Sequence, residues 1–265
     1  RVTVLFAITG APQFYKRSLT NLINLRPSYA AEGHVLTQYA LTTLKARKFA
    51  LFYQNDAFGR GLLEASKVLL KQKEITEILD VPYDRNEERF ESQAKRTIAF
   101  DPDVILFFST ALAARSFIEQ MGIPFVQKKE LLGNSDLGEV EFQAFIQEQS
   151  LPFKYVSVVP NPKTSDLQIA QEFRDAAQKN NVPLDTFSFE SYIGVDILLH
   201  VLQRMKKPIS RNEIIEALSA IKESDYKGLE LSFDPQTRTL LHSLWMNTGV
   251  SQWEKIPVST GSKKG

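Results

Sequence analysis

Small polar and aromatic residues follow four strand-like runs of the sequence. Hydroxyl, carboxylate and aromatic side chains in such loops suit the capture of a small molecule by hydrogen bonds between apolar walls. The same residue types also serve as turn residues or helix N-caps, so each one alone supports either interpretation. The candidates at these four positions are Thr9, Gly10, Asn55, Asp56, Phe58, Gly59, Ser109, Thr110, Asn134, Ser135 and Asp136.

Catalytic motifs are not found in the sequence. It contains no G-x-S-x-G elbow, no H-E-x-x-H pair and no P-loop, and Gly59-Arg60-Gly61 lacks the third glycine of a dinucleotide motif. Cys is absent, which excludes thiolate catalysis, disulfides and Cys-based zinc sites. The three His residues are too scattered to indicate a metal cluster. We therefore expect a binding protein without a cofactor, with an enzyme as a weaker alternative because no nucleophile–base pair is visible.

Composition narrows the possible partners. The chain has 265 residues, of which 43% are hydrophobic and 24% charged, as in an ordinary globular protein of about two domains. Lys and Arg number 32 against 31 Asp and Glu, so the formal net charge is +1. This balance gives no electrostatic signature of nucleic-acid binding. The longest apolar runs, such as 104–108, are far too short to span a membrane, and we expect no stable membrane insertion.

Alternating strand and helix patterns must position the candidate residues. Apolar, β-branched runs predict strands, and apolar residues at helical spacing predict helices between them. This alternation indicates an α/β fold with parallel strands and helices on both faces. The carboxyl ends of parallel strands meet at one edge, where such sheets bind ligands. The predicted strands of the first 160 residues are 2–8, 22–26, 48–53, 75–81, 104–108, 130–133 and 155–159, and the predicted helices are 30–45, 62–72, 90–99, 111–121 and 141–149.

The remaining third of the chain is mainly helical. Helices are predicted at 165–180, 189–205 and 211–221, the last capped by Ser210. A strand-like alternation follows at 229–233, and the segments 243–247 and 251–256 predict a hairpin around Thr248-Gly249. The polar, basic segment 258–265 is predicted to be a flexible tail.

Four stretches of the sequence resemble the periplasmic solute-binding proteins of the leucine/isoleucine/valine-binding family. They are residues 24–33, 49–61, 90–105 and 192–196. The Arg-Pro-Ser-Tyr and Asp-x-Phe-Gly sequences are the most specific, and the similarity extends over residues 1–257. The resemblance implies two α/β lobes of the type 1 periplasmic binding fold, joined by crossing segments near 25–29, 158–165 and 229–234. Lobe one would comprise 1–26 and 159–228, and lobe two 27–158 and 229–257.

The resemblance also implies which residues contact a ligand. The loop that begins at Thr9 would bind a ligand carboxylate, and Phe58, with its neighbour Asp56, would line the cleft from lobe two. Ser109 and Thr110 would belong to a strand-end loop on the same side, and Tyr192 would lie near the cleft on a lobe-one helix. The complete set implied by the resemblance is Thr9, Gly10, Ala11, Asp56, Phe58, Ser109, Thr110, Ala111, Ser135, Asp136 and Tyr192.

Two departures from the family pattern affect these expectations. Ser135 stands where amino-acid binders place an acid, and a buried ligand ammonium needs a paired charge. A carboxylate or another small polar metabolite therefore fits as well as an amino acid. The chain also starts at Arg1 with neither Met nor a signal peptide, which predicts a processed or truncated product that lacks the N-terminal third of the family. Lobe one would then expose apolar helix residues such as Val195, Leu198, Leu199 and Leu202.

The function implied by the resemblance is the binding of a small polar metabolite in an interlobe cleft and its delivery to the permease of an ABC transporter. The implied location is periplasmic or extracellular. Two alternatives of the same fold remain open, namely a ligand-sensing module of a receptor or regulator and a truncated remnant without binding.

Overall fold

The computed structural model describes residues 2–249 and 252–258, which form two compact units. Unit 1 comprises the described residues of 2–28, 158–245 and 255–258, and unit 2 comprises 29–157, 246–249 and 252–254. The units are therefore interleaved along the chain. This division places 229–245 in unit 1, whereas the predicted lobes place it in lobe two, and the lobe boundaries stay a prediction.

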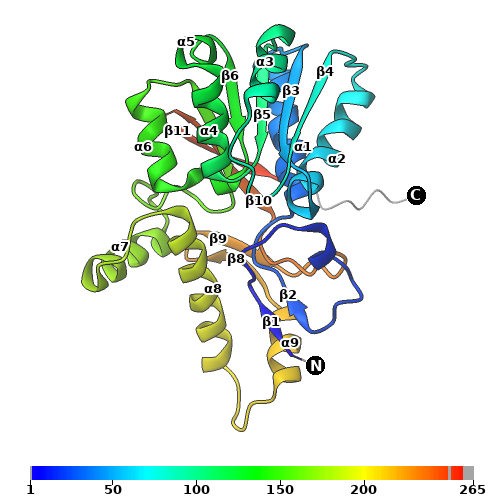
Figure 1. The fold of residues 1–265 in the computed structure, drawn as a ribbon. Helices are drawn as coiled ribbons and strands as arrows, with labels where there is room; N and C mark the ends of the chain where they lie inside the picture. The colour runs from blue at the N-terminus through cyan, green and yellow to red at the C-terminus, as the bar shows by residue number, and fades with distance from the viewer. Residues whose placement is uncertain (1, 250–251, 259–265) are drawn as a thin grey trace. The chain divides into compact units, whose positions relative to one another are not determined.

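A seven-stranded sheet forms the centre of unit 2 and includes two strands that continue into unit 1 (Figure 1). The strand order is β11-β10-β7-β6-β5-β3-β4, and the pairs from β4 through to β7 are parallel. Every residue of β3 and β5 is buried, as expected for central strands of a sheet covered on both faces. The strands are β3 (Phe49–Gln54), β4 (Ile78–Tyr83), β5 (Val104–Phe108), β6 (Glu130–Gly133), β7 (Phe153–Ser157), β10 (Ser243–Gly249) and β11 (Gln252–Pro257).

Helices of unit 2 cover both faces of this sheet. Helices α1 and α2 pack against each other and against β3 and β5, while α4 packs against α3, α5 and α6. Figure 1 shows this layered arrangement of helices around the strands. The helical elements are α1 (Tyr29–Thr42), α2 (Ala57–Gln72), α3 (Glu91–Phe100), α4 (Ala111–Met121), α5 (Ile123–Val126), the 3-10 helix η2 (Ser135–Gly138) and α6 (Val140–Glu148).

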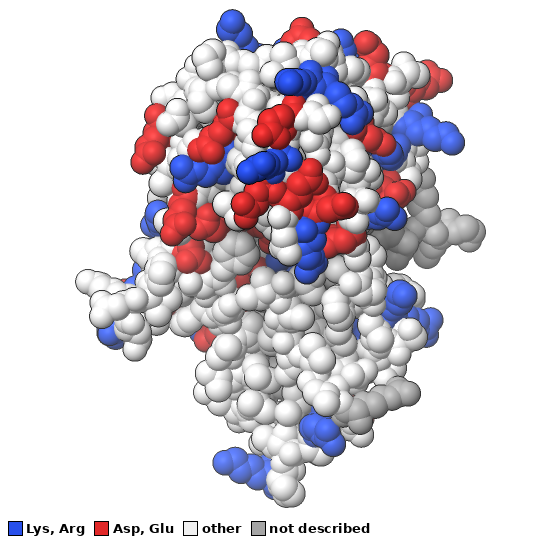
Figure 2. All heavy atoms as spheres, in the orientation of Figure 1, with Lys and Arg blue, Asp and Glu red and all other residues white. Residues whose placement is uncertain are grey.

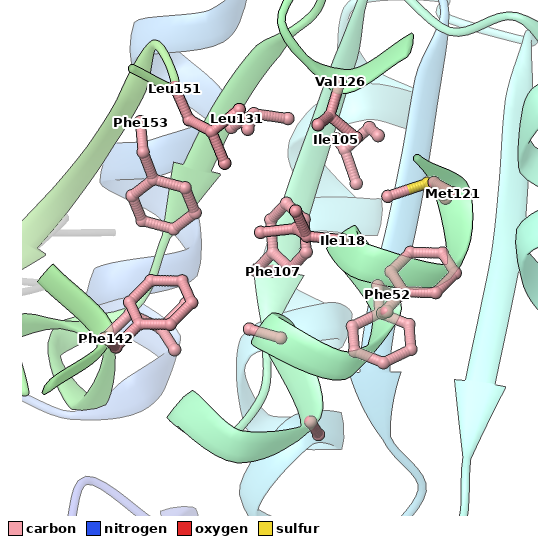
Figure 3. Close-up of a cluster of buried hydrophobic side chains, with 14 of the residues drawn as sticks. Phe52, Ile105, Phe107, Ile118, Met121, Val126, Leu131, Phe142, Leu151 and Phe153 are labelled. Atoms are coloured by element: carbon pink, nitrogen blue, oxygen red, sulfur yellow. The ribbon is translucent and has the colours of Figure 1, made fainter. Parts of the chain in front are cut away.

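An aromatic cluster fills the face of the sheet that α3, α4 and α6 cover (Figure 3). Phe52 stacks on Phe117 with ring centroids 4.1 Å apart and on Tyr83 at 4.7 Å. Phe107 meets the edge of Phe117, and Phe153 meets both Phe107 and Phe142. Because side chains alternate along a strand, the neighbours of Phe52 and Phe107 face α1 and α2 instead. The sheet is thus held rigidly between two apolar layers.

Unit 1 has less regular structure. Strands β1 and β2 form a short parallel pair, and β8 and β9 form an antiparallel pair. The Phe6 ring packs so closely on Gly194 that a Cβ there would lie 3.0 Å from it. The elements are β1 (Val4–Leu5), the 3-10 helix η1 (Pro12–Phe14), β2 (Leu22–Ile23), α7 (Gln168–Asn180), α8 (Thr186–Gln203), α9 (Arg211–Ser219), β8 (Lys222–Tyr226) and β9 (Leu229–Ser232).

Several apolar side chains of unit 1 are exposed, and the exposure predicted for helix α8 is confirmed in part, because Leu198 and Leu202 are half-buried. Val195 and Leu199 of that helix are 56% and 50% exposed, and Val2 beside β1 is 75% exposed. Figure 2 shows that the face of unit 1 in view carries few charged side chains, whereas acidic and basic side chains are mixed over the face of unit 2. Among the described residues, no helix is both long and apolar enough to cross a membrane.

The prediction for the start of α2 was wrong. The segment 54–61 was expected to be a loop before a helix at 62–72, but Gln54 belongs to β3 and the helix begins at Ala57. Asp56 is its N-cap, and its carboxylate accepts the Phe58 N–H at 3.0 Å. A Cβ at position 59 would lie 2.2 Å from the Gln54 carbonyl oxygen, so glycine permits the first turn to approach the end of β3. The Asp-x-Phe-Gly sequence is therefore a tight strand-to-helix junction.

Other differences concern short or polar elements. The predicted strand 2–8 contains only the two residues of β1, and β4 and α7 each begin three residues later than predicted. Strand β8 was not predicted, because Tyr226 is its only buried residue and no apolar alternation marks it. The predicted N-cap Ser210 was confirmed, and it forms a capping box with Glu213. Residues 250–251 of the predicted hairpin and the tail beyond Val258 lie outside the described residues.

Candidate functional site

The carboxyl ends of the parallel strands in unit 2 gather most of the predicted site residues. The chain runs from β3 outward to β4 and then returns past β3 to β5, so the connections leave β3 and β5 in opposite directions. Such a topological switch point is where open α/β sheets bind ligands. Asp56 follows β3, and Ser109 and Thr110 follow β5. Polar residues therefore follow both β3 and β5, the two strands that flank the switch point.

Asp56 is fixed by four donors of its own unit. Its Oδ2 accepts Gln54 Nε2 at 2.7 Å and both Nη2 and Nε of Arg85 at 2.7 and 3.2 Å. Its Oδ1 accepts the Phe58 N–H. Burial alone would raise the pKa of Asp56, but the hydrogen bonds from Arg85, Gln54 and Phe58 outweigh it and hold that pKa below its usual value. The carboxylate is thus ionised and already engaged at neutral pH.

Tyr83 links the ends of β4, β3 and β5. Its hydroxyl donates towards Gln54 Oε1 at 3.4 Å and accepts the Thr110 N–H at 3.3 Å. Burial raises the pKa of Tyr83 to about 12, with a further contribution from the charges of Asp56 and Asp136. The phenol therefore stays protonated as a donor over the whole physiological range.

Asn134 continues the hydrogen-bonded chain from β5 to β6. Its Oδ1 accepts the Ser109 N–H at 3.1 Å, and its Nδ2 donates to Asp136 Oδ2 at 3.0 Å. Asn134 and Ser109 are both completely buried. The Ser109 Oγ has no hydrogen-bond partner among the described residues. We call the resulting row of groups the polar strip, which comprises Gln54, Asp56, Tyr83, Arg85, Ser109, Thr110, Asn134 and Asp136.

Ser135 is tied to the first turn of α1 and not to the polar strip. Its N–H donates to Glu32 Oε2 at 2.8 Å, and its hydroxyl donates to Glu32 Oε1 at 3.1 Å. Glu32 is completely buried. A carboxylate therefore lies directly beside the position where the sequence carries serine in place of an expected acid.

The other predicted residues of unit 2 lie at the starts of helices. The Phe58 ring in the first turn of α2 meets the edge of Tyr29 with centroids 5.0 Å apart. Thr110 precedes α4 and is exposed, and its side chain makes no capping hydrogen bond. Ala111 is the first residue of α4 and is half-buried.

The predicted residues of unit 1 lie on two separate elements. In the loop before η1, Thr9 Oγ1 accepts the Ala11 N–H at 3.3 Å, which leaves the hydroxyl proton of Thr9 available to an acceptor. Gly10 and Ala11 are buried. Tyr192 lies on α8, and its ring packs against Phe173 with centroids 5.4 Å apart. Within the described residues, no hydrogen bond or ring contact joins Tyr192 to the 9–11 loop.

The sequence did not predict Tyr83, Arg85 and Glu32 as site residues. Gln54 and Asn134 were predicted in strand-end loops but were not in the final set of ligand contacts. Gln54 ends an otherwise apolar strand, and Asn134 directly follows one, so both carried a positional signal. Arg85 and Tyr83 carried none, because their role depends on the pairing of β4 with β3. No group of three or more potential metal-binding side chains occurs in the part of the chain that the structure describes.

Comparison with known proteins agrees with this architecture. A family model described as periplasmic binding protein matches residues 4–252. The Leu/Ile/Val-binding protein BraC3 of Rhizobium johnstonii is 22% identical over 213 residues, which are 80% of this chain and 57% of that protein. The chain thus spans little more than half the length of this relative.

Solved structures extend the comparison to the fold. A possible leucine/isoleucine/valine-binding protein from Rhodopirellula baltica is 23% identical with a TM-score of 0.83, and the match covers 95% of this chain and 70% of that one. A solute-binding protein of an ABC transporter from R. palustris, solved with benzoate, is 13% identical with a TM-score of 0.76, covering 94% and 68%. The parallel sheet, its flanking helices and the match over residues 4–252 show that the chain belongs to the periplasmic binding protein family, as its resemblance to the leucine/isoleucine/valine-binding proteins predicted.

Proposed function

We propose that the chain binds a small polar metabolite, an amino acid or a carboxylate, between its two lobes and delivers it to the permease of an ABC transporter. Binding would shift the protein between open and closed states by its different affinity for the two, and no bond would be made or broken. The proposed location is periplasmic or extracellular. The names of the relatives support this class of function, since they describe binding proteins and not enzymes.

The polar strip is the observation that carries the proposal. It places fixed donors and acceptors at the switch point of the parallel sheet, and its protonation states are set by its own contacts. A preorganised row of this kind binds a ligand without a large cost of ordering side chains. The unpartnered hydroxyl of Ser109 is a ready contact for a ligand once a movement of its surroundings exposes it.

The loop at Thr9 supplies complementary chemistry from unit 1. The free hydroxyl proton of Thr9 can donate to a ligand carboxylate. The Phe58 ring, held edge-on by Tyr29, offers an apolar wall in unit 2. A ligand with one carboxylate and an apolar body satisfies both groups, and amino acids and aromatic acids share this chemistry.

Isothermal titration calorimetry tests the proposal. The chain is titrated with L-leucine, L-isoleucine, L-valine and benzoate, and one saturable site is expected for at least one of them. Thr9→Val and Phe58→Ala should each weaken that binding by about tenfold, the equivalent of one lost hydrogen bond or packed ring. Thr42→Val on α1 and Phe125→Ala on α5 are matched controls and should bind normally. Absence of binding to every compound would favour the truncated remnant.

Glu32 distinguishes the two ligand classes. Because its carboxylate lies beside Ser135, it can supply the negative charge that an ammonium group needs even though position 135 is serine. Glu32→Gln should weaken binding of the amino acids more strongly than binding of benzoate, which has no ammonium group. If Glu32→Gln weakened the binding of amino acids and of benzoate equally, the role of Glu32 would be to hold the 135–138 turn in place.

A further inference from the structure

Tyr15 has one hydroxyl proton and three backbone carbonyl oxygens within hydrogen-bond distance. The Tyr15 oxygen lies 3.0 Å from the Thr9 carbonyl, 3.0 Å from the Arg26 carbonyl and 3.2 Å from the Pro27 carbonyl. A phenol donates only one hydrogen bond, so these three acceptors compete for the same proton. All four residues belong to unit 1.

The competing carbonyls belong to two segments with different roles. Thr9 lies in the loop to which we assign the ligand carboxylate. Arg26 and Pro27 directly precede the point, between Ser28 and Tyr29, where the chain leaves unit 1 for unit 2. The Tyr15 hydroxyl is therefore shared between the ligand loop and the segment that connects the two units.

The surroundings of Tyr15 are anchored so that the hydroxyl is held in this position. Asn24 Nδ2 donates to the carbonyls of Phe14 and Thr237, both at 3.0 Å. The backbone of the same segment pairs with 238–241, since Asn24 N donates to the Arg238 carbonyl at 2.7 Å and Leu241 N to the Leu25 carbonyl at 2.9 Å. These hydrogen bonds hold the backbone on both sides of Tyr15, so that its hydroxyl stays within reach of all three carbonyls.

We propose that Tyr15 is a positioning residue that couples the ligand loop to the connecting segment. Donation to the Thr9 carbonyl holds the loop, whereas donation to Arg26 or Pro27 holds the backbone next to the unit boundary. A ligand that engages Thr9 biases this choice and thereby the backbone from which unit 2 continues. The ligand half of this proposal rests on the proposed function, and the coupling to the connecting segment does not.

The test measures the distance between the two units in Tyr15→Phe, which removes only the hydroxyl. Because the chain contains no Cys, Lys71→Cys on α2 and Lys179→Cys on α7 accept spin labels at defined sites. We expect the distance distribution of the unliganded protein to broaden or shift in Tyr15→Phe. Tyr39→Phe on α1 is the matched control, because the Tyr39 hydroxyl has no hydrogen-bond partner in the described part of the chain, and it should leave the distribution unchanged.

Ligand affinity gives the second readout. If L-leucine or benzoate binds the unaltered chain, Tyr15→Phe should weaken that binding by about two- to tenfold. Tyr15→Gln, which retains a donor on a shorter side chain, should recover part of the normal distance distribution. A distribution in Tyr15→Phe identical to that of the unaltered chain overturns the coupling, even if neither ligand binds. Loss of folding in Tyr15→Phe, judged by circular dichroism, also overturns it, because the hydroxyl would then serve stability alone.

Discussion

Individual side chains at the strand ends of unit 2 are fixed mainly by their neighbours within that unit. Asp56 receives four hydrogen bonds, two of them from the Arg85 guanidinium. A charge that is already compensated changes little when a ligand arrives, so specificity would come from geometry as much as from net charge. This arrangement depends on close approach of the backbone at the junction of β3 and α2, where Gly59 is the critical residue.

Gly59→Ala should destabilise the protein. The added Cβ would lie 2.2 Å from the Gln54 carbonyl oxygen and 2.7 Å from the Gln54 nitrogen, and backbone atoms cannot turn aside as a flexible side chain can. The gain in helix propensity is about 1 kcal/mol, whereas a forced shift in a packed region typically costs about 1–3 kcal/mol or more. We expect a net loss of about 1–2 kcal/mol in urea unfolding.

A second glycine provides the control for this prediction. A Cβ at Gly249 in β10 would meet nothing within 4 Å, so Gly249→Ala should change the free energy of unfolding by less than about 0.5 kcal/mol. If Gly59→Ala were as stable as Gly249→Ala, the close packing of α2 on the end of β3 would be wrong. Ligand affinity should fall with stability in Gly59→Ala, because Asp56 and Phe58 lie in the same turn.

Whole elements differ in how far the sequence predicts them. Strands β3 and β5 and helix α4 followed from apolar runs and helical spacing, because burial imposes those patterns directly. The predicted start of α2 was wrong, because the helix includes Gly59 and Gly61, which have low helix propensity, and begins after the N-cap Asp56. Strand β8 gave no pattern, since its position depends on polar contacts with α7 and α8. The candidate site shows the same difference. Residues that directly follow a strand could be predicted, whereas partners from a neighbouring strand, such as Arg85, could not.

Polar contacts hold β8 and the following turn to the helices of unit 1. Lys227 Nζ contacts Glu172 of α7 at 2.6 Å and Asp196 of α8 at 2.8 Å, and the Tyr226 hydroxyl donates to Asp196 at 2.6 Å. At the other end of β8, Glu223 Oε1 lies 2.9 Å from His200 Nε2 and 3.0 Å from Arg204 Nη1. An element with little apolar burial is thus positioned by charge.

Glu223→Gln should reduce stability in a pH-dependent way. Burial alone would raise the pKa of Glu223, but the hydrogen bonds and charges of His200 and Arg204 outweigh it and hold that pKa below its usual value. Because the pKa of Glu223 is lower in the folded protein than in the unfolded chain, where it is about 4.3, the ionised carboxylate stabilises the fold above that pH. This stabilisation is lost as the pH falls through the pKa of the folded protein. The melting temperature of Glu223→Gln should therefore lie below that of the unaltered chain at pH 7 and approach it below about pH 4.

The size of this effect is limited because both partners are partly exposed. Ion pairs of this kind typically contribute no more than about 1 kcal/mol. Glu216→Gln on α9 is the control, since that exposed side chain has no hydrogen bond or ion pair among the described residues. An offset between Glu223→Gln and the unaltered chain that stayed constant from pH 7 to pH 3 would mean that packing, and not the charge of Glu223, sets the difference.

The molecule as a whole is interleaved, so the chain passes between its two units several times. The transitions lie at 28/29, 157/158, 245/246 and 254/255, and the last two fall inside β10 and β11. Trp245 and Trp253, the two tryptophans of the sequence, lie within two residues of these last transitions. The Trp245 side chain lines a small cavity with Val158, Val159 and Leu241, next to the second transition. Intrinsic fluorescence should therefore report on the connecting segments without any label.

Titration with a bound ligand should change the tryptophan emission if binding moves one unit against the other. The emission of Trp253→Phe isolates Trp245, whose surroundings include two of the connecting segments, and its change should saturate at the same ligand concentration as the calorimetric heat. The reciprocal variant, Trp245→Phe, isolates Trp253, which meets the edge of Tyr155 with centroids 5.7 Å apart inside unit 2. Its emission should change less, because its main ring contact lies within one unit. If calorimetry showed binding but the emission of both variants stayed constant, the ligand would be held without rearrangement of the connecting segments. This result would contradict the proposed closing mechanism but not the ligand site.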